Sequence, residues 1–242
     1  MKSKKLFLVK RQPRKQLNLP KHQKNQMSEN NVKFEVLHMP PTNTNSVLVS
    51  SGRDAVIIDA WGKPADWDKV LLERGLTLRA IYSTHGHPDH ISAAPALARA
   101  FNIDWFLSEK DNFLIGWGNE LLDMFSIPHI HQDYKRPVNL CAGVKEILPN
   151  INMEIWDSPG HTPGGLMFYF PEYKILITGD TLFATSFGRF DFPGGDKNAL
   201  MQSIKNVYNK NLDDETYVVH GHDHDTTIGW LKQHNPFFNG QI

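Results

Sequence analysis

Short apolar runs separated by turn residues dominate the pattern of the chain and predict a series of strands. Residues 47–49 and 55–58 are two such runs around a turn that contains Gly52, which predicts a β-hairpin. Residues 166–170 and 174–178 flank Pro171 in the same way and predict a second hairpin. Single strands are predicted at residues 80–83, 103–107, 153–156 and 216–219.

Helices are predicted where apolar positions recur three and four residues apart. Trp67, Val70 and Leu71 share one face of a helix over residues 66–73. Further helices are predicted at residues 91–101, 113–125, 198–208 and 226–234, whereas the stretch from 126 to 150 is expected to be loop. Strands that come first and then alternate with helices are typical of a layered α/β fold, in which functional residues collect at strand ends.

A cluster of metal-ligand residue types follows the predicted strand 80–83. Residues 84–90 read Thr-His-Gly-His-Pro-Asp-His, which places His85, His87, Asp89 and His90 within one loop. Neutral imidazole and carboxylate are ligands that zinc, iron and manganese accept. In a loop that leaves a strand, His85 and His87 can point one way while Asp89 and His90 point another. This arrangement would serve two metals side by side.

Three further candidate ligands also follow predicted strands. His161 lies in Pro-Gly-His-Thr-Pro-Gly, Asp180 in Thr-Gly-Asp-Thr, and His222 in His-Gly-His. Each residue alone is more typical of a surface, capping or turn position. Their occurrence in this order, together with the loop at 84–90, predicts a metal site.

These motifs resemble the metallo-β-lactamase superfamily, and within it the glyoxalase II-like thioester hydrolases. The resemblance covers about residues 34–238 and includes the glycine-rich stretch 188–195. It implies an α/β fold, a four-layer αβ/βα sandwich, and a cofactor of two divalent metal ions, with zinc expected and iron or manganese acceptable. Asp59 matches an early acid of the family and is expected to orient a ligand. The resemblance assigns His85, His87 and His161 to the first metal, Asp89, His90 and His222 to the second, and Asp180 to both.

The activity that the resemblance implies is hydrolysis of a thioester, such as a hydroxyacyl-glutathione, by a metal-bound hydroxide. Two cations lower the pKa of a bound water toward about 7, and Asp89 is expected to help orient that water as a catalytic residue. The carboxylates of a glutathione carrier would need basic partners, and Arg189 and Lys232 are candidates. The alternative is a persulfide dioxygenase with a single iron on His85, His161 and Asp180.

Other histidines and aromatic residues are weaker candidates. His129 and His131 form a second His-x-His but are expected to be loop residues, and His224 is expected near the site without being a ligand. Aromatic residues of the segment 111–150 could line the substrate pocket, although core positions are more common for such side chains. The candidates are Trp117, Phe125 and Tyr134.

Charge divides the chain into two parts. Residues 1–26 hold nine Lys and Arg and no acid, which leaves the remainder with 17 basic and 26 acidic residues. We expect residues 1–30 to be a disordered basic extension and residues 31–242 to be the catalytic domain. The acidic body argues against nucleic acid as a partner, and no apolar stretch suggests a membrane span. The lone Cys141 forms no intramolecular disulfide, and with no targeting signal visible we expect a cytoplasmic protein with a small-molecule substrate.

Overall fold

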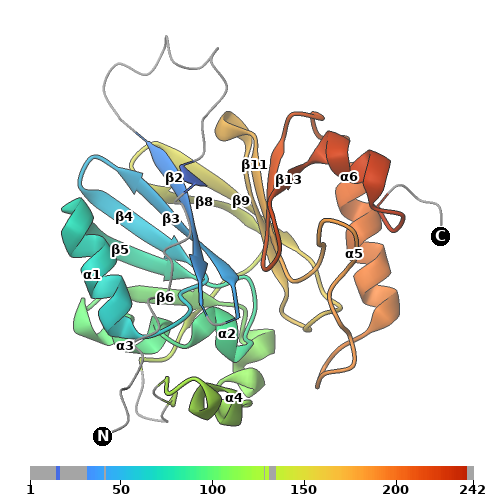
Figure 1. Ribbon diagram of the computed structural model, residues 1–242. Helices are drawn as coiled ribbons and strands as arrows, with labels where there is room; N and C mark the ends of the chain where they lie inside the picture. The colour runs from blue at the N-terminus through green and yellow to red at the C-terminus, as the bar shows by residue number, and fades with distance from the viewer. Residues whose placement is uncertain (1–14, 17–31, 41, 128, 131–134, 239–242) are drawn as a thin grey trace, which may run out of the picture.

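Two β-sheets lie face to face in the centre of the molecule, and helices cover their outer sides (Figure 1). The structure is a computed structural model, and it describes residues 15–16, 32–40, 42–127, 129–130 and 135–238. The layers run helix, sheet, sheet, helix from one side of the molecule to the other. The four-layer αβ/βα sandwich implied by the sequence resemblance is therefore confirmed.

The first sheet holds seven strands in sequence order, antiparallel from β1 to β4 and parallel from β4 to β7. The predicted hairpin around Gly52 is confirmed, with Ser51 paired to Asp54. The strands of this sheet are β1 Lys15–Gln16, β2 Lys33–Met39, β3 Thr44–Ser51, β4 Asp54–Ile58, β5 Thr77–Tyr82, β6 Asp104–Leu107 and β7 Val138–Asn139.

The second sheet holds six strands in the order β13-β12-β11-β10-β9-β8. Among its described strands, β11 and β12 pair in parallel and the other neighbours pair antiparallel. The predicted hairpin around Pro171 is confirmed as the pair β10–β11. Its strands are β8 Gly143–Leu148, β9 Ile151–Asp157, β10 Leu166–Phe170, β11 Ile175–Gly179, β12 Tyr217–His220 and β13 Thr226–Thr227.

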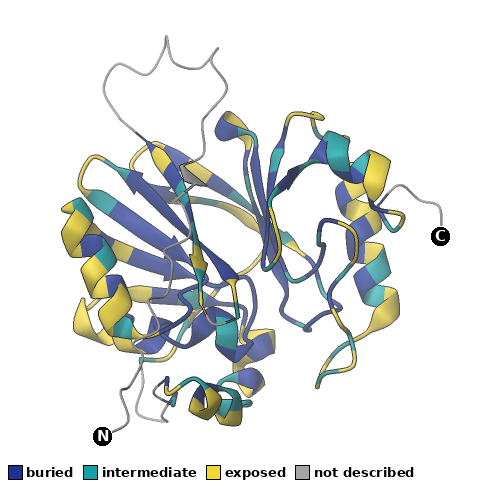
Figure 2. Ribbon diagram, viewed as in Figure 1, coloured by how far each residue is buried: buried dark blue, intermediate teal, exposed yellow. Residues whose placement is uncertain are grey.

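Alternating side chains of the inner strands enter different apolar layers. Val47 and Val49 of β3 face the second sheet, whereas Leu48 between them packs under the helices. Phe168 and Met167 of β10 divide in the same way between the central layer and the layer below α5. Because both faces of the inner strands are covered, strands such as β3 are buried almost throughout (Figure 2). Burial on both faces explains why their sequences are continuous apolar runs.

The helices divide between the two outer faces. Trp67 of α1 and Leu97 of α3 pack on the first sheet, and Leu200 of α5 and Leu231 of α6 pack on the second. Helix α1 ends at Gly75, whose φ of 63° is left-handed. The helices are α1 Pro64–Arg74, α2 Pro88–Ile91, α3 Ala94–Ala100, α4 Asn119–Met124, α5 Lys197–Asn209 and α6 Ile228–His234, with 3₁₀ turns η2 Glu109–Leu114 and η3 Pro171–Tyr173.

Three predictions from the apolar pattern are wrong in part. The helix predicted over residues 113–125 is split between η2 and α4, because Gly116 and Gly118 have φ of 84° and 75°. The helix predicted over 91–101 divides into α2 and α3. The stretch 126–150, predicted as loop, contains β7 and β8, whose residues are partly exposed and therefore lack a strong apolar pattern.

The predicted basic extension lies almost wholly outside the described residues. Within residues 1–30 the structure describes Lys15–Gln16, which pairs antiparallel with β2 at the edge of the first sheet. Among the described helices, none is both long enough and apolar enough to cross a membrane.

Candidate metal centre

The seven predicted site residues meet at one edge of the sandwich, where strands of both sheets end. The first sheet supplies the loop and short helix that follow β5, and the second supplies the loop after β9 and the ends of β11 and β12. Side chains far apart in sequence are thereby brought into three overlapping groups whose candidate ligand atoms lie within 4.8 Å of one another. These groups are His85, His87 and His161; His85, His90 and Asp180; and Asp89, His90 and His222.

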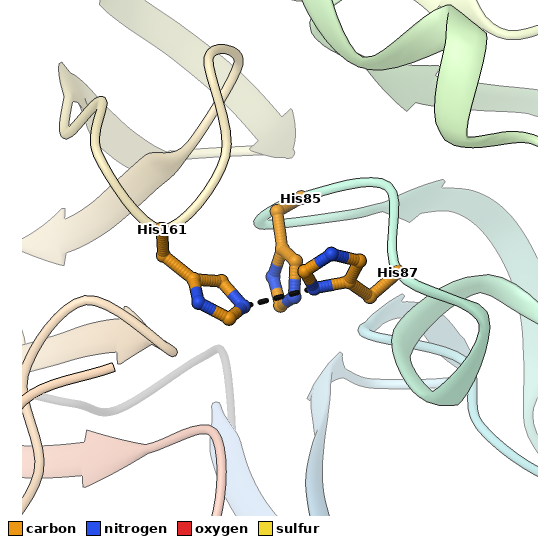
Figure 3. Close-up of side chains that lie close together, drawn as sticks. All are labelled: His85, His87 and His161. Carbon is orange, nitrogen blue, oxygen red and sulfur yellow. Dashed lines mark hydrogen bonds between the residues drawn. The ribbon is translucent and has the colours of Figure 1, made fainter. Parts of the chain in front are cut away.

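In the first group, three buried imidazoles converge from two loops (Figure 3). His85 and His87 lie on the loop after β5, and His161 faces them from the loop after β9. The Nδ1 atom of His87 is 2.9 Å from the Nε2 atom of His161. Two nitrogens at about 2.0–2.1 Å from one tetrahedral zinc are about 3.3 Å apart. The spacing is therefore close to that of two ligands of one ion.

Asp180 lies between the first group and the group of Asp89, His90 and His222. Its Oδ1 is 3.3 Å from Nε2 of His90. Its Oδ2 is 3.6 Å from Nε2 of His161 and 3.5 Å from Nε2 of His222. His222 Nε2 is in turn 3.2 Å from Asp89 Oδ2. A single carboxylate thus contacts imidazoles of both groups.

The Nδ1 atoms of four of these histidines face oxygen atoms outside the three groups. Such partners orient an imidazole ring and leave the other nitrogen free to bind a metal. Asp59, predicted to orient a ligand, does contact His90. The pairs are His85 Nδ1 with Thr84 Oγ1 at 3.1 Å, His90 Nδ1 with Asp59 Oδ2 at 3.0 Å, His161 Nδ1 with the Arg189 carbonyl at 2.6 Å, and His222 Nδ1 with the Thr42 carbonyl at 3.3 Å.

The donor set fits divalent metal ions. Within the described part of the chain, Nε2 of His85 is buried and has no hydrogen-bond partner, which is costly unless a ligand occupies it. Burial, together with the neighbouring imidazoles, lowers the pKa of His85, and burial lowers the pKa of His87 to about 3. These two rings are therefore neutral at physiological pH, which is the form that binds a metal.

The carboxylates and the remaining imidazoles are strongly coupled. Burial alone would raise the pKa of Asp180, but His90 and His222 hold it well below its usual range. Burial would lower the pKa of His222, but Asp180 and Asp89 raise it to about 10. Without a metal, protons on the imidazoles balance the buried carboxylates, so a divalent cation can take their place.

A cavity of about 470 Å³ opens beside the metal-ligand groups. One wall is aromatic: the rings of Trp117 and Phe192 are 5.2 Å apart, and each lies within 5.6 Å of the His87 ring. Asp89 faces the same cavity. The cavity is lined by His87, Pro88, Asp89, Trp117, Gly118, Leu121, His161, Asp180, Phe183, Arg189, Phe192 and His222.

Of the two basic residues predicted to meet substrate carboxylates, the structure places only Arg189 at the cavity. Its guanidinium lies 3.7 Å from the centre of the Phe192 ring and makes two hydrogen bonds of 2.8 Å to Asp191. Lys232 instead donates to Asp214 at 2.6 Å and is not among the described lining residues.

The weaker candidates separate clearly. His129 bonds to Asp123 at 2.7 Å and belongs to none of the metal-ligand groups, and His224 packs against Trp230. Trp117 lines the cavity, whereas Phe125 packs against Trp61 in the helix layer. His131 and Tyr134 lie outside the described residues.

The sequence patterns missed three residues near the site. Phe183 and Phe192 line the cavity from loop positions that have no periodicity to reveal them. Asp111, in η2, is fully buried and binds two of the site loops. An isolated acid in a segment without a strand carries no local signal of such a role.

Comparison with known proteins agrees with the fold. Residues 39–222 match the family model of the metallo-beta-lactamase superfamily. The chain is 37% identical over 199 residues to hydroxyacylglutathione hydrolase GloC of Haemophilus influenzae, covering 81% of this chain and 92% of that protein. It is similar in structure to BLEG-1 B3 metallo-beta-lactamase, with a TM-score of 0.76, 30% identity and coverage of 86% and 100%. It is also similar to TTHA1623 in a di-iron-bound form, with a TM-score of 0.74, 31% identity and coverage of 84% and 98%. The chain therefore belongs to the metallo-beta-lactamase superfamily.

Proposed function

We propose that this metallo-hydrolase is a binuclear enzyme that cleaves thioesters such as a hydroxyacyl-glutathione, with residues 31–242 as its catalytic domain. The observation that carries the proposal is the pair of ligand groups on either side of Asp180. The likeness to GloC supports the substrate class, and the di-iron form of TTHA1623 supports a site for two ions. In this proposal His85, His87 and His161 hold one ion, Asp89, His90 and His222 hold the other, and Asp180 binds both.

When bound, two divalent ions supply an activated water and polarise the acyl carbonyl. Asp89, at the cavity wall and 3.2 Å from His222, accepts a hydrogen bond from the attacking water and orients it as the catalytic carboxylate. The carrier leaves as a thiolate. Because the pKa of a thiol is about 8.5, this leaving group needs little proton assistance. No serine or cysteine nucleophile is required.

The cavity lining suggests how the rest of the substrate is held. Trp117 and Phe192 present an apolar wall that excludes water from the reacting thioester. Arg189 is the one arginine or lysine of the lining, as far as the described residues extend. We propose that it binds a carboxylate of the thiol carrier, since its guanidinium is already oriented by Phe192 and Asp191.

Metal analysis combined with two substrate assays tests the proposal. We expect about two metal ions per chain by mass spectrometry and turnover of members of a thioester panel by the loaded protein. Absence of turnover across the panel would overturn the thioesterase assignment. About one iron per chain, with oxygen consumed in the presence of glutathione persulfide, would favour the mononuclear dioxygenase instead.

A further inference from the structure

Asp111 is a buried carboxylate that belongs to none of the metal-ligand groups. It lies in η2 Glu109–Leu114 and is completely shielded from solvent. Its Oδ2 accepts hydrogen bonds from the backbone N–H of Gly86 at 2.9 Å and from the Thr162 hydroxyl at 2.7 Å. Its Oδ1 accepts from the backbone N–H of Gly164 at 2.6 Å.

The donors belong to the two loops that carry the first ligand group. Gly86 lies between His85 and His87, and Thr162 directly follows His161. One loop comes from the first sheet and the other from the second. A single side chain therefore joins the backbones of both loops beside the three imidazoles shown in Figure 3.

The close approach of Asp111 depends on glycine in each loop. A Cβ atom at Gly86 would lie 3.0 Å from the Cβ atom of Asp111, and one at Gly164 would lie 2.7 Å from its Cγ atom. The contact at Gly164 is shorter than real Cβ atoms show, and the one at Gly86 is tight enough to force Asp111 to shift. Glycine in each loop thus leaves room for the Asp111 side chain between them.

The chemistry of the three partners calls for a group that only accepts hydrogen bonds. Two partners are backbone N–H groups and cannot reverse their roles. An asparagine in place of Asp111 would turn its NH₂ toward at least one of them and leave that N–H buried without an acceptor. Burial raises the pKa of Asp111, while the three hydrogen bonds counteract this rise.

We propose that Asp111 is a positioning residue for the first metal ion. Its carboxylate holds the loop of His161 at a set distance from the loop of His85 and His87. The proposal rests on the ligand assignment of the proposed function. Asp59 contacts the ring of a ligand, His90. Asp111 instead accepts hydrogen bonds from residues next to the ligands, among them the backbone N–H groups of Gly86 and Gly164.

Asp111→Asn in two single-site backgrounds tests the proposal. His222→Ala leaves the first ligand group intact, and His87→Ala leaves the second. Zinc affinity of each metal-stripped protein is measured by competition with a chromophoric chelator. We expect Asp111→Asn to weaken zinc binding about 10–100-fold in the His222→Ala background and less than about threefold in the His87→Ala background. Asp54→Asn, at a half-buried acid paired with Arg79, is the matched control and should change neither affinity.

A general structural role would weaken both single-site proteins equally, and that result, or no change in either, would overturn the proposal. If Asp111→Asn does not fold, as judged by circular dichroism, Thr162→Val decides: it removes one hydrogen bond and keeps the shape of the side chain. A loss of a few-fold confined to the His222→Ala background is expected, and an unchanged or equal effect overturns the proposal. Failure of the unmutated protein to bind two ions would instead contradict the ligand assignment itself.

Discussion

At the scale of single residues, Asp180 is the side chain that contacts both candidate ligand groups, because its two oxygens face histidines of both. We predict that Asp180→Ala lowers turnover by more than about 100-fold, since removal of a ligand should exceed the cost of losing an outer partner. Mass spectrometry should show fewer than two metal ions per chain. Asp213→Ala, at an exposed acid that pairs with Lys174, should change neither quantity. Full turnover with two bound ions in Asp180→Ala would refute the bridging role.

Arg189 provides a second residue-scale prediction, on specificity. Arg189→Gln should raise KM for a glutathione thioester about tenfold and leave kcat nearly unchanged. The proposed contact between Arg189 and a substrate carboxylate stabilises the bound substrate and the transition state equally, so its loss weakens both alike. A thioester without a carboxylate should show no change. Lys232→Gln serves as the control, since Lys232 pairs with Asp214 outside the described lining. An equal effect on charged and uncharged thioesters would argue against a carboxylate partner.

At the scale of elements, helix α5 is fixed directly to the loop that carries His161. The backbone N–H of Asp196 donates to the Gly160 carbonyl at 2.8 Å, and the Ser203 hydroxyl donates to the Pro159 carbonyl at 2.7 Å. A Cβ atom at Gly160 would lie 2.2 Å from the backbone nitrogen of Leu200. The start of α5 and the His161 loop can therefore approach this closely only with glycine at position 160.

We predict that Gly160→Ala destabilises the protein by about 3 kcal/mol or more, because α5 and the His161 loop must move apart. The same movement displaces His161 and should therefore weaken metal binding. Urea unfolding and metal titration measure the two effects. Gly52→Ala is the matched control: its φ is also positive, but a Cβ there meets no atom within 4 Å. It should cost about 1–2 kcal/mol and leave metal binding unchanged. Comparable losses in the two variants would contradict the steric explanation.

The burial of each strand explains whether the apolar pattern of the sequence could predict it. Strands buried on both faces, such as β4 and β11, are continuous apolar runs and were predicted correctly. Strand β8 exposes Val144 and much of its length, so its apolar pattern is too weak to predict a strand. Histidines that cluster within one loop are visible locally. The contacts of Asp111 with Gly86 and Gly164 arise only in three dimensions, so no local pattern could predict them.

At the scale of the whole molecule, the candidate ligands follow strands of both sheets, so bound metal ions would join the two halves. His85 and His87 come from the first sheet, and His161 and His222 from the second. We predict that removal of the metal by a chelator lowers Tm by about 5–10 °C per ion. An ion at a hundredfold excess over its Kd stabilises the folded state by about 2.7 kcal/mol. In a protein of this size each kcal/mol changes Tm by about 2–4 °C. Differential scanning calorimetry before and after zinc is restored measures this. A Tm insensitive to metal would show that the ions do not stabilise the folded protein.

The charge balance of the centre makes metal binding depend on pH in a defined direction. Burial opposes protonation of His222, but Asp180 and Asp89 raise its pKa to about 10 in the metal-free protein. Below that pH the ring carries a proton that a metal must displace, so affinity should rise with pH by up to about tenfold per unit for each proton released. His87, whose pKa burial lowers to about 3, is already neutral and contributes no proton near pH 7. Calorimetric zinc titrations at pH 7, in buffers that differ in ionisation enthalpy, count the protons released. We expect His222→Ala to release about one proton fewer than the unmutated protein, and equal release from both would show that His222 is not the proton displaced by the metal.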